Sequence, residues 1–204
     1  RTLVYSRAKA VSDSIPFGTT LDVMAPGYQW MNQSFAPTRL SSHDFRIDIG
    51  GKDCTQKYSA SIFNISAMSF GSLSANAIMA LNLGAKKGGF AHDTGEGSIS
   101  QYHRVHGGDL IWEIGSGYFG CRNPDGSFNA EKYTENALDP QVKMIEIKLS
   151  QGAKPGHGGI LPGSKVTAEI AAARGVKEGE ACISPASHSA FSTPLELIHF
   201  VKKL

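Results

Sequence analysis

One unit recurs along residues 61–175: a mostly apolar strand-like run, a turn rich in glycine and a helix-like stretch. The strand-like runs cover residues 61–68, 89–93, 110–114 and 142–149. Strands that alternate with helices pair in parallel, and glycine turns after successive strands place chemistry at the carboxyl ends of the strands. The pattern predicts an α/β fold, the N-terminal half of a (β/α)8 TIM barrel, because a whole barrel needs ~250 residues. An open doubly wound sheet is the alternative, disfavoured because no GxGxxG follows the first strand.

Residues that start and stop helices support this division. Ser74 is expected to cap a helix over 75–87, which stops at the glycines 88 and 89. Further helices are predicted over 130–137, over 166–174 with Gly175 as the stop, and over 195–204. A strand-like run at 181–184 is either the start of a fifth strand or, as we expect, a loop strand before the last helix.

The first part of the chain has a less regular pattern. Residues 1–58 are predicted to form an irregular arm packing on the barrel, with a loop at Ser14–Gly18 and a half-exposed strand at Phe45–Ile49. Residues 59–204 are predicted to form the first half of the barrel. Because the chain starts with Arg1 and its last helix lacks a stop signal, an internal fragment is expected. A half barrel leaves a strand edge unpaired, so the fragment alone is expected to be inactive.

Composition argues against several classes of function. The net charge of +2, without Lys/Arg clusters among aromatic residues, indicates no nucleic-acid partner. No apolar run approaches the roughly 20 residues of a membrane span, so the sequence indicates a cytoplasmic protein, with any membrane association left to residues absent from this chain. Cys54, Cys121 and Cys182 lack metal-ligand spacing, so no metal site is predicted and small buried thiols are expected.

The loop Gln151–Gly163 is the strongest candidate for a binding site. It follows a strand-like run and contains five glycines and two prolines around Lys154. Glycine lets the backbone approach a ligand closely, and proline limits the entropy of such a loop. Gln151 and Lys154 are candidates for binding a carboxylate, because a charge-assisted hydrogen bond strengthens where water is excluded.

Three other features are weaker candidates. Glu96, in the turn Thr94–Gly97, is a candidate for holding an amine or a water, although a turn glutamate is commonly solvated. The stretch Ala67–Gly71 is a candidate for contact with a planar ligand, although an apolar strand entering a helix has the same pattern. Arg174 is a candidate carboxylate ligand, or only a partner of its helix dipole.

The histidines and one serine do not form a recognisable catalytic pattern. The histidines considered, which lack the spacing of a zinc helix, are His92, His103, His106, His157 and His188. Most of them are expected to have structural roles. The stretch Ser184–His188 lacks the GxSxG elbow, so a serine hydrolase is not indicated.

Several motifs, in this order and spacing, resemble the central FMN-binding barrel domain of ferredoxin-dependent glutamate synthases. They are MSFGSLS (68–74), TGEG (94–97), SGYFG (116–120), EIKLSQGAKPGHGGILPG (146–163) and ISPASHSAFSTPLEL (183–197). The resemblance covers roughly residues 60–204. It is closest to the bacterial glutamate-synthase-like proteins of the FMN-binding glutamate synthase family.

The resemblance implies an FMN oxidoreductase that reduces 2-iminoglutarate, made from 2-oxoglutarate and ammonia, to L-glutamate. Electrons would come from a ferredoxin-like donor through an iron-sulfur cluster whose cysteines lie beyond this chain. Ammonia would come from solution, or from glutamine on another subunit, because nothing in the chain resembles an amidotransferase domain.

Roles for individual residues follow from the same resemblance. The residues implied to bind 2-oxoglutarate are Gln151, Lys154 and Arg174. Glu96 and Lys154 would act at the reacting atoms, Glu96 by stabilising the positive iminium. The residues implied to line the FMN are Ala67, Met68 and Ser69.

Two positions depart from the family pattern. Tyr118 stands where the SGRFG turn usually has arginine, and Ser98 stands where glycine usually follows TGEG. A different substrate therefore stays open, such as methylamine giving N-methylglutamate, or another 2-oxo acid. An alternative from another class is a membrane-associated scaffold that has lost catalysis, because Tyr118 is expected in a ligand-facing turn.

Overall fold

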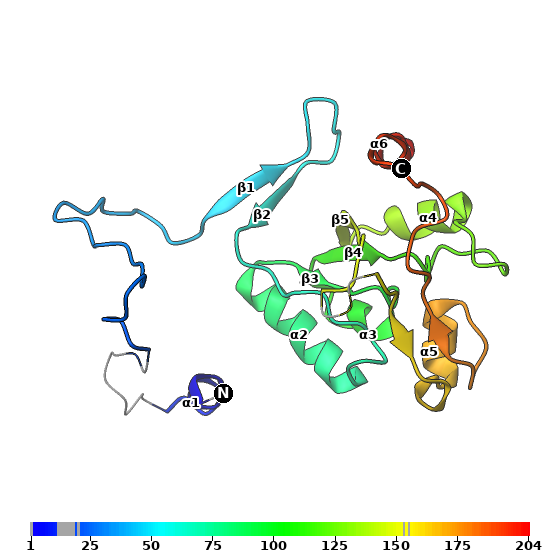
Figure 1. Cartoon of the computed structure of the whole chain (residues 1–204), viewed down its shortest axis with the longest axis horizontal. Coiled ribbons are helices and arrows are strands. Elements are labelled where there is room, and N and C mark those ends of the chain that lie inside the picture. The colour runs from blue at the N-terminus through cyan, green and yellow to red at the C-terminus, as the bar shows by residue number, and fades with distance from the viewer. Residues whose placement is uncertain (1, 12–18, 20, 153, 155) are drawn as a thin grey trace. The chain divides into compact units, whose positions relative to one another are not determined.

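The computed structural model of the protein describes residues 2–11, 19, 21–152, 154 and 156–204. Contacts divide the chain into two units, Arg1–Ser41 and Ser42–Leu204. In the first unit, helix α1 (Thr2–Ala8) precedes turns and irregular chain (Figure 1). The loop predicted at Ser14–Gly18 lies outside the described residues. None of the helices formed by the described residues combines the length and apolar character that crossing a bilayer demands.

A parallel sheet is the centre of the second unit. Its strands, in spatial order, are β3 (His92–Asp93), β4 (Leu110–Ile114) and β5 (Val142–Ile147). Asp93 is in register with Ile111, and Glu113 with Glu146. Ile65 adds one parallel bridge to His92. The predictions of parallel pairing and of a mixed α/β fold are therefore confirmed.

Helices follow the strands at the predicted places. In the second unit the described residues form α2 (Ala75–Gly88), α3 (Gln101–Arg104), α4 (Ala130–Ala137), α5 (Ala168–Arg174) and α6 (Pro194–Lys203). Ser74 caps α2 by accepting from the Ala77 N–H, and Gly89 ends it with a φ of 67°. Gly175 ends α5 in the same left-handed conformation. Only α3 has no counterpart in the sequence pattern, because four residues are too few to show a helical period.

Two short antiparallel pairs lie outside the parallel sheet. In the first, β1 (Arg46–Ile49) pairs with β2 (Tyr58–Ser61). In the second, β6 (Ile160–Leu161), which precedes the 3-10 turn η1 (Gly163–Lys165), pairs with β7 (Cys182–Ile183). The position of β7 confirms that the run at 181–184 is a loop strand.

The predicted strand at 61–68 is wrong in its limits. Strand β2 ends at Ser61, and within this stretch Ile65 provides the one bridge to the parallel sheet. The side chain of Asn64 occupies the backbone groups that a continuous strand would use, since its Nδ2 donates to Ser61 O and its Oδ1 accepts from the Ala91 N–H. The strand predicted at 45–49 is confirmed by β1, but the expectation that it is half-exposed is wrong, because every residue of β1 is exposed.

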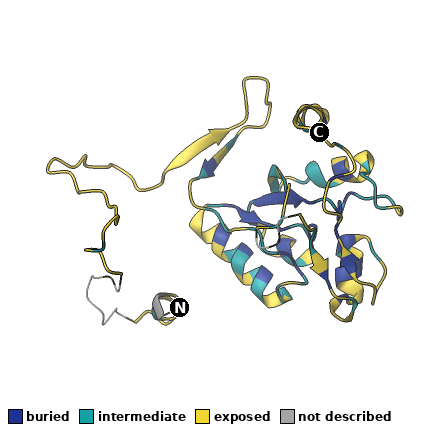
Figure 2. Cartoon of the chain, viewed as in Figure 1, coloured by how far each residue is buried: buried dark blue, intermediate teal, exposed yellow. Residues whose placement is uncertain are grey.

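The interior of the second unit consists of two apolar clusters. One includes Phe70, Ile78, Phe119, Leu161, Ile170 and Cys182, and the other includes Leu110, Trp112, Ile114, Tyr118 and Tyr133. Figure 2 shows β4 as a buried strand and the helices with their outer faces exposed. Cys121 and Cys182 are buried as predicted, whereas Cys54 is exposed. The second cluster contains three residues of β4, including Ile114 at its carboxyl end.

Candidate functional site

A small cavity lies where the parallel strands end. It has a volume of about 240 Å³ and is lined by Ala67, Met68, Ser69, Ser72, Leu73, Gly95, Glu96, Glu113, Lys148 and Gln151. These residues come from separate segments that the sheet brings together, as is usual for sites at the carboxyl ends of parallel strands. One cavity therefore contains five of the predicted site residues, Ala67, Met68, Ser69, Glu96 and Gln151.

Glu96 and Gln151 are in direct contact. Glu96 lies in the turn after β3, which is closed by a hydrogen bond from the Gly95 N–H to Asp93 Oδ1 at 2.9 Å. The Gln151 Nε2 donates to Glu96 Oε1 at 2.9 Å and to Oε2 at 3.1 Å. The amide of Gln151 thus fixes the direction in which the carboxylate points.

Glycines make the room that the Glu96 carboxylate occupies. A Cβ atom added at Gly115 would lie 2.8 Å from Glu96 Oε2, and one added at Gly159 would lie closer still to Oε1. A Cβ atom added at Gly95 would lie 2.6 Å from the Ser69 nitrogen. Each distance is too short for real atoms, so side chains at these positions would displace Glu96 or the segment at Ser69.

Lys148 provides a positive charge inside the cavity. Its Nζ lies 3.5 Å from Glu113 Oε1 and 3.8 Å from Glu96 Oε1. Glu113 is only 3 % exposed, and burial raises the pKa of its carboxyl group, although the ammonium of Lys148 lowers it. Lys148 therefore stabilises a buried negative charge and links it to Glu96.

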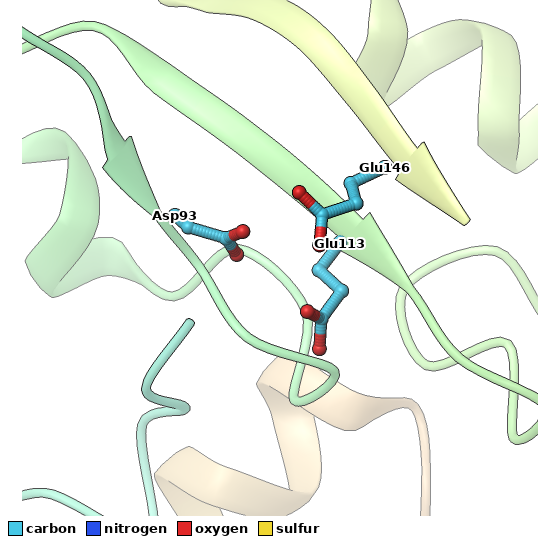
Figure 3. A group of neighbouring side chains, drawn as sticks. All are labelled: Asp93, Glu113 and Glu146. Carbon is cyan, nitrogen blue, oxygen red and sulfur yellow. The ribbon is translucent and has the colours of Figure 1, made fainter. Parts of the chain in front are cut away.

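Three carboxyl groups gather on the same face of the sheet as Lys148. Figure 3 shows Asp93, Glu113 and Glu146 projecting from three neighbouring strands into a shared space. An oxygen from each lies within 4.8 Å of the others. Burial, together with the charges of Glu113 and Glu146, raises the pKa of Asp93 to about 7. Carboxylate oxygens suit a divalent cation, but Lys148 already supplies a cation to this group.

Arg174 is a buried cation beneath the turn that carries Glu96. It is 4 % exposed, and its Nη2 donates to Ser69 Oγ and to Phe70 O, both at 3.3 Å. Its guanidinium carbon lies 5.1 Å from the centre of the Phe119 ring. Among the described residues, Arg174 has no carboxylate within ion-pair distance. Burial lowers its pKa, so an anionic ligand would stabilise this charge.

Lys154 occupies a different position from the other predicted residues. Its side chain is exposed, and its backbone forms an isolated bridge with Gln151. Ala153 and Pro155, on either side of it, are outside the described residues. The structure thus brings Gln151 to Glu96 and Arg174 to Ser69, whereas Lys154 lies at the outer side of the loop.

Tyr118 does not line the cavity, contrary to the expectation of a ligand-facing turn. Its side chain is fully buried in an apolar cluster, and its hydroxyl bonds to His188 and Ala190. The departure from the usual arginine therefore changes the interior and not the wall of the cavity, which removes the observation that suggested a scaffold.

Most of the histidines have structural surroundings, as expected. His92, His103 and His188 are buried. Burial lowers the pKa of His92 to about 4 and that of His103 to about 3, so both are neutral. None of the histidines lines the cavity.

The sequence interpretation missed Glu113, Lys148 and the carboxylates beside them. A signal for them exists, because strands of a parallel sheet are covered on both faces and normally consist of continuous apolar residues. Glu113 interrupts such a run in β4. Glu146 in β5 and Lys148 just after β5 are two residues apart, so in an extended chain they point to the same side. Charged residues at these positions indicate a polar interior at the end of the sheet.

Comparisons with known proteins agree with the resemblance seen in the sequence. A family model described as the conserved region in glutamate synthase matches residues 39–204. The glutamate synthase large subunit-like protein YerD of Bacillus subtilis is 40 % identical over 170 residues, which are 82 % of this chain and 32 % of that protein. An archaeal glutamate synthase [NADPH] of Methanocaldococcus jannaschii is 39 % identical over 69 % of this chain and 25 % of its own length. The chain thus spans about a third or less of these relatives, and over that span it belongs to the glutamate synthase family.

Proposed function

We propose that the protein is an FMN-dependent oxidoreductase that reduces 2-iminoglutarate, formed from 2-oxoglutarate and ammonia, to L-glutamate. In this proposal residues 59–204 are the first half of a (β/α)8 barrel, preceded by the arm 1–58. Family membership supports a reaction of the glutamate synthase type. The parallel strands with their site at the carboxyl ends support the barrel.

The observation that carries the proposal is the buried guanidinium of Arg174 next to a cavity that also contains carboxylates. Arg174 lacks an ion-pair partner among the described residues, whereas Glu96 and Glu113 line the cavity. A ligand that has carboxylates and a positive nitrogen matches both kinds of charge. 2-Iminoglutarate in its iminium form has these groups, and so does glutamate.

Each charged residue of the site would bind a substrate group of the opposite charge. Arg174 would bind a substrate carboxylate through its planar donors, and Lys148 would add a cation on the far side of Glu96. Glu96, oriented by Gln151, would stabilise the iminium nitrogen. Lys154 remains in the proposal as a second carboxylate ligand at the outer side of the loop.

The cavity residues that come first in the chain, from Ala67 to Leu73, would contact the FMN ring. Ala67, Met68 and Leu73 give apolar contacts, and Ser69 gives polar ones. At about 240 Å³ the cavity is smaller than the roughly 300–1,000 Å³ of a typical ligand pocket, so these residues would hold one side of the ring. When bound in its reduced form, FMN would supply the hydride for the imine carbon, which with the proton already on the iminium nitrogen gives the amine.

The electron donor is proposed to be a ferredoxin-like protein that acts through an iron-sulfur cluster. The name of the relative from M. jannaschii contains NADPH, which makes NADPH the alternative donor. Comparing the two reductants in one assay separates these donors.

A reduced-flavin assay tests the proposed reaction. The full-length protein with FMN, reduced without oxygen and mixed with 2-oxoglutarate and ammonia, is expected to reoxidise its flavin and to release one glutamate per flavin. Mixtures that lack either substrate are the controls. Methylamine in place of ammonia tests formation of N-methylglutamate. Flavin that stays reduced with ammonia and with methylamine would contradict the proposal.

Replacing Arg174 with lysine is expected to raise the KM for 2-oxoglutarate about 10- to 100-fold. The change removes planar donors to a charged group, which contribute about 1.5–3 kcal/mol. FMN affinity should change less than twofold. Arg122→Lys is the matched control, because Arg122 lies 5.4 Å from the same Phe119 ring but donates to Gly117 O, whereas Arg174 donates to Ser69, which lines the cavity. Equal effects of the two substitutions would remove Arg174 from the substrate site.

A further inference from the structure

A buried chain of hydrogen bonds connects the segment before α6 to the end of β5. The His188 Nε2 lies 2.7 Å from Lys148 O, and its Nδ1 lies 3.1 Å from the Tyr118 hydroxyl. The Ala190 N–H donates to that hydroxyl at 3.1 Å. The imidazole also stacks on Phe191, with ring centres 4.6 Å apart. His188 thus bonds to the backbone carbonyl of Lys148, the residue whose ammonium enters the cavity, and Tyr118 bonds to the other nitrogen of that imidazole.

The donors fix how the protons are arranged. Because Ala190 supplies an N–H, the Tyr118 oxygen accepts there and its own O–H is free to donate to His188 Nδ1. The carbonyl of Lys148 can only accept, so His188 Nε2 must carry a proton. The neutral Nε2–H tautomer satisfies every bond, and burial favours the neutral form by lowering the pKa of His188.

We propose that Tyr118 and His188 are positioning residues, which hold the Lys148 backbone so that its ammonium lies between Glu96 and Glu113. The effect on catalysis rests on the proposed function, but the placement of the ammonium does not. Lys148 directly follows β5 and precedes the loop that carries Gln151. A shift of its carbonyl would therefore move both Lys148 and the amide that orients Glu96.

Other bonds hold the same segment without touching Lys148. The Ser184 N–H donates to Gly159 O at 2.9 Å, and the Ser116 hydroxyl donates to Pro185 O at 2.5 Å. Loss of the Tyr118 and His188 bonds should therefore loosen Lys148 while the segment stays in place. This separation allows a positioning role to be distinguished from a general loss of folding.

Three substitutions test the proposal in the full-length protein. His188→Phe keeps the stack on Phe191 and removes both polar bonds, and Tyr118→Phe removes the hydroxyl alone. His188→Gln keeps an acceptor for Tyr118 and a donor for Lys148 O, so it should restore the function that His188→Phe loses. Tyr133→Phe is the control, because Tyr133 belongs to the same apolar cluster as Tyr118, whereas the hydroxyl bonded to His188 Nδ1 is that of Tyr118.

The first readout is the ¹³Cε resonance of Lys148, assigned by its absence in Lys148→Met. We expect this resonance to shift in His188→Phe and Tyr118→Phe and to stay in place in His188→Gln and Tyr133→Phe. An unmoved resonance in both phenylalanine variants would overturn the proposal. A His188→Gln spectrum that matches His188→Phe would also overturn it.

The second readout is steady-state glutamate formation. The kcat of His188→Phe and Tyr118→Phe should fall about 10- to 100-fold, the size expected when a catalytic group is displaced by about 1 Å. The KM for 2-oxoglutarate should change much less, because Arg174 is untouched, and His188→Gln should stay within about threefold of the parent kcat. Losses confined to KM would overturn the proposal. If the parent makes no glutamate, the proposed function fails, and the Lys148 resonance still decides the positioning role.

Discussion

Replacing Lys148 with methionine is expected to lower the free energy of unfolding by about 3 kcal/mol near pH 8 and to abolish glutamate formation. The Lys148 Nζ lies 3.5 Å from a carboxylate oxygen of Glu113, whose side chain is almost completely buried. Removing one partner of a buried ion pair leaves an uncompensated charge and costs about 3–5 kcal/mol. The lower end applies because about a quarter of the Lys148 side chain is exposed.

Urea unfolding at several pH values measures this effect. Burial already raises the pKa of Glu113, and without Lys148 that pKa should rise further. The destabilisation should therefore be largest at alkaline pH and shrink as the pH falls and Glu113 takes up a proton. Lys143→Met is the matched control on the exposed part of β5, and it should change stability by less than about 0.5 kcal/mol. Adding Glu113→Gln to Lys148→Met should recover much of the loss, and no recovery would refute the assigned cause.

Replacing Asp93 with asparagine is expected to raise the free energy of unfolding above that of the parent protein. This difference should be about 2–4 kcal/mol larger at pH 8 than at pH 4. The pKa of Asp93 is about 7 in the folded protein, against an ordinary value of 3.8. A carboxyl group with a raised folded pKa contributes stability below its unfolded pKa and loses it as the pH rises through the folded pKa. In the parent protein this loss should extend from about pH 4 to about pH 7, and asparagine cannot ionise.

The substitution also keeps the local structure of the turn. Asparagine retains an Oδ1 that can accept from the Gly95 N–H, as Asp93 does at 2.9 Å. Denaturation curves at pH 4, 6 and 8 provide the measurement. Asp48→Asn, on the exposed strand β1, should leave the pH dependence of the parent unchanged. If Asp93→Asn and the parent show parallel pH profiles, the raised pKa of Asp93 is wrong.

The order of strands and helices could be predicted from local signals. Ser74 and Gly89 mark the two ends of α2 because their cap chemistry depends on neighbouring residues alone. The stretch after Ser61 could not be predicted, because the side chain of Asn64 bonds to Ala91, 27 residues away. A periodic pattern of apolar residues does not indicate when a side chain will bond to the backbone groups that strand pairing would use.

The candidate site could be predicted in part. The turn with Glu96 and the loop with Gln151 were found because glycine turns at strand ends are recognisable, and the fold then brings the two side chains into contact. Lys148 was overlooked because a lysine within a strand resembles a solvated residue until the sheet shows which face it occupies. The role of Lys154 stays a prediction, since its side chain is exposed.

The space that the Glu96 carboxylate occupies restricts which residues two separate loops can have at Gly115 and Gly159. Gly115 and Gly159 both have a φ outside the left-handed region, so φ does not require glycine at either position. What requires it is the volume of one acidic group, which fills the space a methyl would take. Mutational drift at both sites is therefore limited by steric exclusion from a distant turn, and an alanine there would threaten the placement of the acid more than the stability of its own loop.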